Sequence, residues 1–245
     1  MSVVIEVKNL TKKFNLNTKK NIFEKIASLT TQKKQITALD NLSFSIKKGE
    51  VVGIIGYNGS GKTTLLQTIA GIYSPDSGTI KVSGSMAPVL QIGSGFNTEL
   101  DATENIIIYG MLLGLSKKYI KSKIHLIMEY AEINEFSELK LKHFSAGMKS
   151  RLAVSTIFQL EPDILLLDEI LAVGDFKFRE KCFKTFISLK EKNRTILIST
   201  HALNLLPLFC DRVLLINKGK LVAFTSPNEA VKQFKDLFES EKKSK

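Results

Sequence analysis

Residues 51–66 read VVGIIGYNGSGKTTLL, and this stretch decides the fold. Its middle part, residues 56–63, matches the phosphate-loop pattern G-x-x-x-x-G-K-[ST] at every position. The apolar run 51–55 before it is typical of a buried parallel strand. The residues after it have helical periodicity up to Gly71, a typical C-terminal cap. A strand, a glycine-rich loop and a helix in this order predict an α/β fold that binds a nucleoside triphosphate.

The residue types of this loop suit phosphate. Glycines let the backbone curl so that successive N–H groups point at phosphate oxygens, and the following helix adds the positive end of its dipole. Lys62 would place its charge on the outer phosphates, and the Thr63 hydroxyl can bind magnesium. A glycine-rich turn with a solvated lysine is the simpler alternative, but it would not require both the strand and the helix. The predicted nucleotide-binding residues of the loop are Gly56, Tyr57, Asn58, Gly59, Ser60, Gly61, Lys62, Thr63 and Thr64.

The composition narrows the class of protein. With 44% hydrophobic residues, a chain of 245 residues can bury one large core or two closely packed subdomains. Cys182 and Cys210 form no C-x-x-C pair, so neither a disulfide framework nor a zinc site is indicated. The start of the chain lacks the pattern of a secretory signal, and no window approaches the ~18–20 apolar residues of a membrane-spanning helix. Any action at a membrane would therefore need a partner that spans it.

The formal net charge of +11 is compatible with nucleic acid, with an anionic membrane surface, or with neither. The lysines are spread along the chain, and no basic run alternates with aromatic residues. We therefore expect solvated faces and no nucleic acid partner.

Hydrophobic patterning divides the chain into an α/β part and a helical part. It predicts strands at 3–7, 39–46, 51–55, 79–82, 86–91, 164–167 and 195–199, and a closing hairpin at 213–223. It predicts helices at 103–113, 117–131 and 147–159. Within residues 15–36, the sequence NIFEKIASL predicts an amphipathic helix that packs on its own domain or faces a partner or a membrane surface. Residues 239–245 are expected to be frayed.

Polar side chains follow two of the predicted strands. Asp168 and Glu169 end the run 165–167, and His201 follows the run 195–199. Because ligands of an open α/β sheet bind at the carboxyl ends of its strands, Asp168 is expected beside the magnesium ion and Glu169 beside the attacking water. A turn cap and a structural histidine are the simpler alternatives.

The segment FSAGM at 144–148 begins a predicted helix, with Ser145 as its N-cap and Gly147 in its first turn. An exposed helix N-terminus is also an anion site. Its distance from Lys62 in the sequence leaves open that it serves a second nucleotide.

The order of these motifs resembles the ATP-binding subunits of ABC transporters over residues 1 to about 235. The matching segments are the phosphate loop, Gln91 as the Q-loop glutamine, FSAGM as the signature (LSGGQ is commonest), ILLLDE at 164–169 as the Walker B strand, residues 172–175 as the D-loop, and His201 as the switch histidine. Phe14 falls where this family stacks an aromatic ring on adenine. The resemblance implies a P-loop ABC ATPase domain with a RecA-like α/β core, an antiparallel β subdomain, a helical signature subdomain at about 98–160 and a basic tail at 236–245.

A narrower resemblance is to the polysaccharide exporters, which move O-antigen, capsule or teichoic acid. It rests on MAPVLQIGSGFN at 86–97 and LAVGDFKF at 171–178, and the segment 15–36 has a counterpart there. Gln91 departs from the glutamate that these exporters often carry. Some of them bind the glycan with an extra C-terminal domain, which is not matched here, so glycan recognition by this chain is not expected.

The resemblance implies a head-to-tail homodimer with ATP and Mg²⁺ between the phosphate loop of one copy and the signature of the other, residues Ser145, Ala146, Gly147 and Met148. Glu169, His201 and Lys62 would be catalytic, and Thr63, Gln91 and Asp168 would bind the metal. It also implies two copies of a transmembrane permease, a lipid-linked glycan as cargo, and a peripheral location on the cytoplasmic face of the bacterial inner membrane.

Three alternatives compete with this interpretation. An ABC exporter of drugs or lipids would not need the segments at 15–36 and 93–97. A soluble ABC ATPase acting on ribosomes or nucleic acid usually carries two ATPase modules or a long coiled coil, and neither is found here. A GTPase would need N-K-x-D, whereas Asn217-Lys218-Gly219-Lys220 lacks the aspartate.

Overall fold

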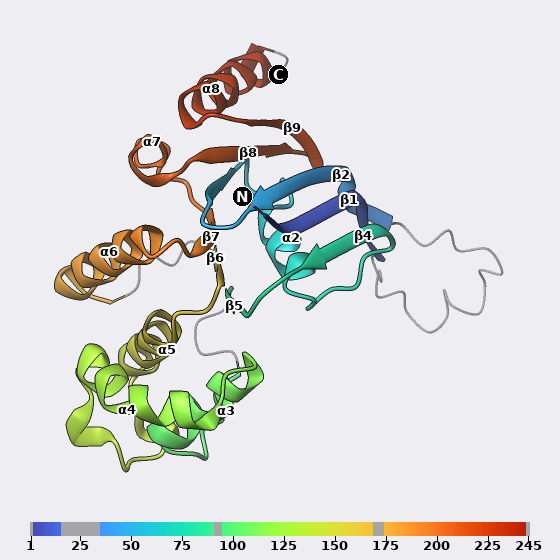
Figure 1. Ribbon diagram of the computed structural model, residues 1–245. Coiled ribbons are helices and arrows are strands. Elements are labelled where there is room, and N and C mark those ends of the chain that lie inside the picture. Colours follow the sequence, from blue (N-terminus) through green and yellow to red (C-terminus); the bar gives the residue numbers. More distant parts are fainter. Residues whose placement is uncertain (1, 16–34, 91–94, 169–173, 244–245) are drawn as a thin grey trace, which may run out of the picture.

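The computed structural model describes residues 2–15, 35–90, 95–168 and 174–243 (Figure 1). Two sheets pack beside a layer of helices. Gln91, Glu169 and residues 172–173 of the predicted D-loop lie outside the described residues. So does the predicted helix at 15–36, except for Asn15, Gln35 and Ile36, which belong to strands. That helix therefore cannot have the predicted bounds.

The central sheet has six strands in the order β5-β6-β7-β3-β8-β9. They are β3 (Val51–Ile55), β5 (Met86–Val89), β6 (Ile164–Asp168), β7 (Thr195–Ser199), β8 (Arg212–Asn217) and β9 (Lys220–Thr225). All neighbouring pairs are parallel except β8 with β9. Because both faces of the sheet are covered, β3 and β7 are buried along their whole length, as their continuous apolar runs predicted.

The second sheet is antiparallel, with the order β2-β1-β4. Its strands are β1 (Val3–Asn15), β2 (Gln35–Lys47) and β4 (Ser77–Val82). The first two are longer than predicted because β1 pairs with β2 as far as Asn15 and Gln35, across several bulges. Between the two sheets lies α2 (Lys62–Ile69), and a shared apolar core joins all three.

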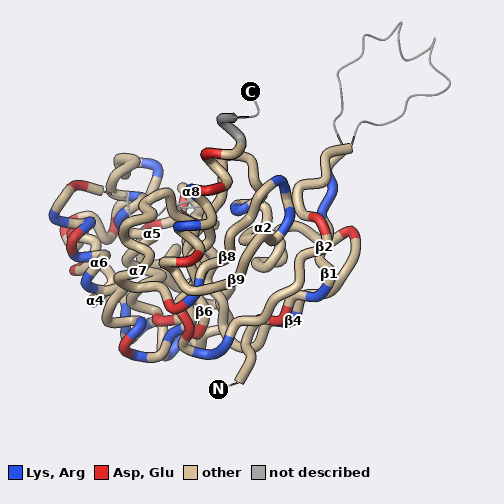
Figure 2. Tube along the Cα trace, turned by 90° about the horizontal axis from the view of Figure 1, so that it is seen from above, with Lys and Arg blue, Asp and Glu red and all other residues tan. Residues whose placement is uncertain are grey.

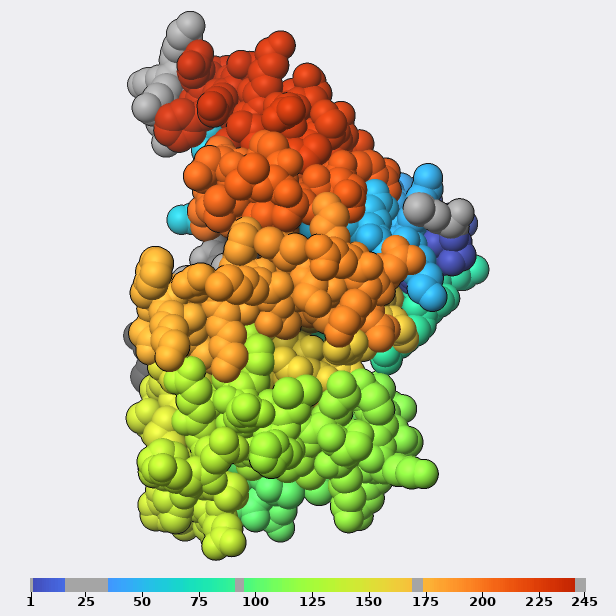
Figure 3. All heavy atoms as spheres, turned by 60° about the vertical axis from the view of Figure 1, so that its left-hand side comes forward, coloured from blue at the N-terminus to red at the C-terminus, as the bar shows by residue number. Residues whose placement is uncertain are grey.

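The helical layer consists of α3 (Ala102–Leu112), α4 (Lys117–Ala131) and α5 (Ala146–Leu160), with short 3₁₀ turns at Asn134–Phe136 and Leu141–His143. These three helices were predicted to within one residue at each end. They enclose an apolar core of their own, and they form a separate lobe at one end of the molecule (Figure 3). Asp101 begins α3 with a capping box, in which its side chain accepts a hydrogen bond from the Glu104 amide.

Three helices on the face of the central sheet away from α2 were not predicted: α6 (Phe176–Glu191), α7 (Leu206–Phe209) and α8 (Pro227–Lys243). They share one core with β3, β6, β7 and β8. The expectation of a frayed end from residue 239 is wrong as far as Lys243. Val231, Phe234 and Leu237 recur at helical spacing and pack on that core, which holds the helix against the sheet.

Lys and Arg alternate with Asp and Glu along the helices and turns (Figure 2). Several of these charges form ion pairs, such as Lys192 with Glu161 and Arg194 with Asp163. Within the described part of the chain, no helix is long and apolar enough to cross a membrane.

Candidate nucleotide-binding site

The phosphate loop connects β3 to α2 at the carboxyl edge of the central sheet. Two of its glycines lie against other backbone. A Cβ at Gly56 would be 2.1 Å from the Ile216 carbonyl oxygen, and one at Gly61 would be 2.6 Å from the carbonyl oxygen of Ala38. A Cβ at Gly59 would meet nothing within 4 Å, although φ there is +75°. The loop is therefore packed tightly on its protein side and open on the other.

Hydrogen bonds hold the loop around Lys62, whose side chain is buried. The Lys62 ammonium donates to the carbonyl oxygens of Gly56 at 2.9 Å and Tyr57 at 3.1 Å. The Tyr57 carbonyl also accepts from the Ser60 amide at 3.0 Å, and the Ser60 carbonyl accepts from the Gly219 amide at 2.9 Å. Gly61 provides no side-chain cap for α2. The N–H groups of the first turn of α2 can therefore face an anion.

A pocket of about 370 Å³ lies against the open side of this loop. Its lining residues come from three parts of the chain: Ile36, Thr37 and Ala38 of β2, Gly59, Gly61, Lys62, Thr63 and Thr64 of the phosphate loop and α2, and Lys218 and Gly219 of the β8–β9 turn. The contributions of β2 and of the β8–β9 turn were not predicted. They follow from the tertiary fold, because these segments are distant from the loop in the sequence.

Phe14 lies on β1, opposite Ile36 of the pocket wall. Its ring meets that of Tyr73 edge-on, with the centroids 5.1 Å apart. The ammonium group of Lys12 lies 5.5 Å from the centroid of Phe14. An aromatic ring therefore stands next to the wall of the pocket that β2 forms.

Thr63 and Asp168, which the sequence analysis assigned to a metal site, meet beside the loop. The Thr63 hydroxyl donates to one carboxylate oxygen of Asp168 at 2.7 Å, and the buried Ser199 hydroxyl donates to the other. Ser199 was not predicted, although the parallel pairing of β6 with β7 places it opposite Asp168. A hydroxyl and a carboxylate are oxygen ligands of the kind Mg²⁺ prefers.

The described residues contain no cluster of three or more His, Cys, Asp and Glu that could hold a metal by itself. A magnesium ion beside a nucleotide does not need one. It commonly takes one or two protein ligands and completes its shell with phosphate oxygens and waters. The Thr63–Asp168 pair therefore fits this ion, provided that a phosphate is present.

His201 lies just beyond the end of β7 on the same edge of the sheet. The Thr200 amide donates to the carbonyl oxygen of Ile54, on the strand that leads into the loop, at 3.4 Å. The structure thus places the loop, Asp168 and His201 along one edge. Gln91 and Glu169 lie outside the described ranges.

The signature segment lies elsewhere in the chain's own fold. Ser145 is the N-cap of α5, and its hydroxyl accepts a hydrogen bond from the Met148 amide at 3.2 Å. Ser145, Ala146 and Gly147 are exposed. Among the described residues, none of α5 lines the pocket at the phosphate loop. One copy of the chain therefore does not bring these two predicted halves of the site together.

Arg151 connects the helical layer to the end of the predicted D-loop. Its guanidinium donates to Glu132 at 2.8 Å and to Asp175, and it lies 5.2 Å from the ring centroid of Phe178. The Asp175 carboxylate also accepts from the Phe178 amide, and this bond, with the nearby Arg151 charge, lowers the pKa of Asp175. Sequence reasoning missed this connection, which requires the packing of α5 on α6.

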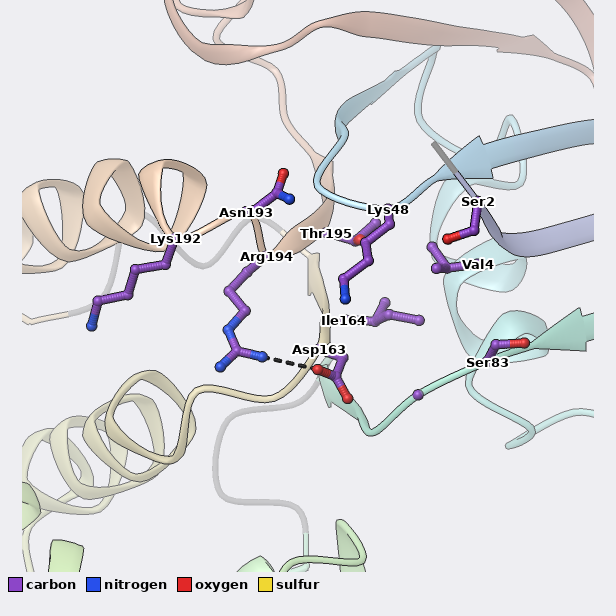
Figure 4. A pocket seen from close by; sticks show the side chains of 11 residues that line it. Ser2, Val4, Lys48, Ser83, Asp163, Ile164, Lys192, Asn193, Arg194 and Thr195 are labelled. Carbon is purple, nitrogen blue, oxygen red and sulfur yellow. Dashed lines mark hydrogen bonds and ion pairs between the residues drawn. The ribbon is translucent and has the colours of Figure 1, made fainter.

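A second pocket, of about 580 Å³, lies at the opposite, amino-terminal edge of the strands (Figure 4). In it, Arg194 donates to Asp163 at 2.9 Å. Asp163 also accepts from the backbone amide and the hydroxyl of Ser85. The bond from the amide is the main reason that the pKa of Asp163 is lowered. Unlike the first pocket, this one has no glycine-rich loop and no helix N-terminus.

Comparison with known proteins shows the family and the fold of this chain. The family model described as ABC transporter matches residues 39–172. An O-antigen export system ATP-binding protein, RfbB of Klebsiella pneumoniae, is 37% identical and covers 96% of this chain and 98% of its own length. A teichoic acids export ATP-binding protein, TagH of Bacillus cereus, is also 37% identical over 96% of this chain, which spans only 43% of that longer relative.

Solved structures agree on the fold. The structure of an ATP-binding subunit of an ABC transporter superposes with a TM-score of 0.76 at 24% identity, covering 95% of this chain and 93% of the other. The ATP-binding cassette MJ0796, solved as a dimer bound to ADP and Pi, superposes with a TM-score of 0.72 at 23% identity, covering 91% of this chain and 98% of the other.

Proposed function

This chain belongs to the ABC transporter family, and from that premise we propose that it binds and hydrolyses ATP to power the export of a lipid-linked polysaccharide. The observation that carries the ATPase part is the meeting of Thr63 with Asp168 beside a complete phosphate loop. The export part rests on 37% identity to RfbB and TagH, which are named for O-antigen and teichoic acid export. The chain would act at the cytoplasmic face of the cell membrane with two copies of a permease subunit.

The pocket at the phosphate loop would hold ATP. Amides of the loop and of the first turn of α2 would bind the phosphates, with Lys62 leaving the loop carbonyls to contact the outer ones. Phe14, beside the β2 wall, would stack on adenine. The head-to-tail partner copy would close the site with its exposed Ser145, Ala146 and Gly147 and the half-buried Met148.

Thr63 and Asp168 would hold Mg²⁺, with Gln91 completing the protein ligands. When bound, this ion neutralises charge on the phosphates and helps to align them. Ser199 fixes the Asp168 carboxylate from its buried side, which keeps the other oxygen directed at Thr63.

Hydrolysis would follow from positioning and charge. Glu169 takes a proton from the water as its oxygen attacks the γ-phosphorus, the bond to the bridging oxygen breaks, and ADP leaves. A general base typically contributes about 10²–10⁴ in rate. His201 and Gln91 would sense the γ-phosphate, and Lys62 would stabilise the charge on it. Separation of the dimer after hydrolysis would then move the permease subunits.

The test is ATPase activity of the purified chain, measured alone and then with its permease in lipid, with and without lipid-linked glycan. We expect stimulation by both additions. Full activity alone, or stimulation by ribosomes or nucleic acid, would contradict the export proposal but not the ATPase proposal. Stimulation by drugs or simple lipids in place of glycan would reassign the cargo.

Glu169→Gln tests the assignment of the base. This variant should bind ATP with about the wild-type affinity but hydrolyse it at least about 100-fold more slowly, because only the proton acceptor is lost. Binding is measured by calorimetry and turnover by phosphate release. Glu161→Gln, which changes an acidic residue outside the phosphate site, serves as the control and should hydrolyse ATP like wild type. Unchanged turnover in Glu169→Gln would overturn the assignment.

A further inference from the structure

The C-terminal helix α8 contacts the phosphate loop through aromatic rings. Tyr57 is the second residue of the loop. Its ring lies 5.2 Å from that of Phe234 and 6.0 Å from that of Phe238, both measured between centroids. The pair with Phe238 is nearly parallel, at 23°. Both phenylalanines lie on α8, one helical turn apart, so two successive turns of the helix cover this one residue of the loop.

The backbone of the same tyrosine holds the centre of the loop. Its carbonyl oxygen accepts from the Lys62 ammonium at 3.1 Å and from the Ser60 amide at 3.0 Å. A rotation of the Tyr57 peptide would therefore change both the position of Lys62 and the direction of the Ser60 amide. The ring on one side and the carbonyl on the other make Tyr57 the residue through which α8 acts on the loop.

The helix is itself anchored to the sheet. Ala230 is fully buried, and Val231, Phe234 and Leu237 pack on the core that β3 and β8 share. Phe238 extends beyond that core and remains 43% exposed. Its ring lies outside that core and stacks on Tyr57. The role of Phe238 can therefore be separated from the folding of the chain.

We propose that Phe234 and Phe238 of α8 are positioning residues, which hold the phosphate loop in its nucleotide-binding form through the Tyr57 ring. This inference rests on the proposed ATP site and extends it to the end of the chain. Displacement of α8 lowers the affinity for nucleotide, and binding of nucleotide changes the surroundings of Phe238, because the coupling between two sites is reciprocal.

The sequence has no tryptophan, so Phe238→Trp introduces a single fluorescent reporter on α8. Addition of MgADP should change its emission, with the same midpoint as binding measured by calorimetry. Phe136→Trp is the matched control, since Phe136 is 39% exposed and lies in the helical layer. Its emission should not change with MgADP.

Phe238→Ala should raise the Kd for MgADP by about two- to tenfold, the range that one aromatic pair supports. The melting temperature should stay within a few degrees of wild type, because the ring is outside the core. Phe238→Trp keeps a ring and should retain the wild-type Kd. Phe136→Ala should leave the Kd unchanged, which excludes a general effect of removing a half-exposed ring.

Two results would overturn the inference while leaving the proposed function intact. One is a wild-type Kd in Phe238→Ala. The other is a silent Phe238→Trp reporter in a protein whose MgADP binding is seen by calorimetry. Absence of nucleotide binding by the wild-type chain would contradict the proposed function itself, and with it this inference.

Discussion

At the scale of single residues, the loop glycines differ in what surrounds them. Gly56 lies against the carbonyl oxygen of Ile216, a backbone atom that cannot rotate away. At Gly59 a Cβ would meet open space, so the left-handed backbone conformation is the one obstacle to a side chain there. The same change to alanine should therefore have different consequences at these two positions.

We expect Gly56→Ala to cost about 2–4 kcal/mol and to abolish MgADP binding, because the strand or the loop must shift to admit the methyl group. Gly59→Ala should cost about 1–2 kcal/mol, the price of a left-handed alanine. For a chain of this size, each kcal/mol lowers the melting temperature by about 2–4 °C. Thermal unfolding and calorimetry check both values. Equal melting temperatures for the two variants would contradict this account of the loop.

The residues of the site were predictable where the signal is local. Lys62, Thr63 and Asp168 stand in short motifs whose spacing carries their chemistry, and the structure brings them together. Ser199 and Lys218 come to the site only through strand pairing and the β8–β9 turn, and they have no motif of their own. The contact of Tyr57 with Phe234 joins distant parts of the chain and was not predicted.

At the scale of secondary structure, Asp163 fastens the start of β6 to its neighbours. It accepts hydrogen bonds from Ser85, just before β5, and from Arg194, just before β7. These partners favour the charged carboxylate, so the pKa of Asp163 is lowered from its ordinary value of 3.8. The stabilisation is therefore complete above pH 3.8 and is lost as the pH falls through the lowered pKa.

Asp163→Asn should have a lower melting temperature than wild type at neutral pH. This difference should narrow as the pH falls below about 4, because the carboxylate is protonated first in the unfolded chain and only at lower pH in the folded one. Melting temperatures of both proteins between pH 7 and pH 3 measure the gap. Asp236→Asn removes a charge from an exposed position on α8 and is the control. A gap that stays constant down to pH 3 would show that the charge of Asp163 contributes nothing.

The elements of the fold were predictable to different degrees. The buried parallel strands were found because their runs are continuously apolar, and α3, α4 and α5 because each has clear helical spacing. α6 was missed although Phe178, Cys182, Phe186 and Leu189 have that spacing and are buried. β1 was placed too short, because its second half carries polar residues and pairs with β2 through bulges, which no local pattern shows.

At the scale of the whole molecule, the comparisons confirm the predicted family and the ABC cassette fold. The proposed site would nevertheless be divided within one copy, because the signature segment is exposed and does not line the pocket at the phosphate loop. A second copy would supply it, so nucleotide and dimer formation should be linked.

Glu169→Gln with MgATP should form a dimer, with a mass near twice 27.3 kDa by light scattering, and with MgADP it should be a monomer. Adding Ser145→Arg should abolish the dimer, because a large cation would occupy the place of the γ-phosphate contact. Ser122→Arg, an equal change at an exposed position on α4, should not. A monomer in MgATP, or equal behaviour of the two arginine variants, would refute the linkage.

The place of β3 in the central sheet also has a consequence for synthesis on the ribosome. β3 lies between β7 and β8, which are translated about 140 residues or more after it. Until residue 217 has left the exit tunnel, the entirely apolar β3 lacks β8 on one of its edges. Until β7 has also left the tunnel, β3 has no neighbour on either edge. Such a strand is a template for aggregation. The nascent chain should therefore depend on chaperones for most of its translation, and the phosphate loop should be among the last parts of the molecule to mature.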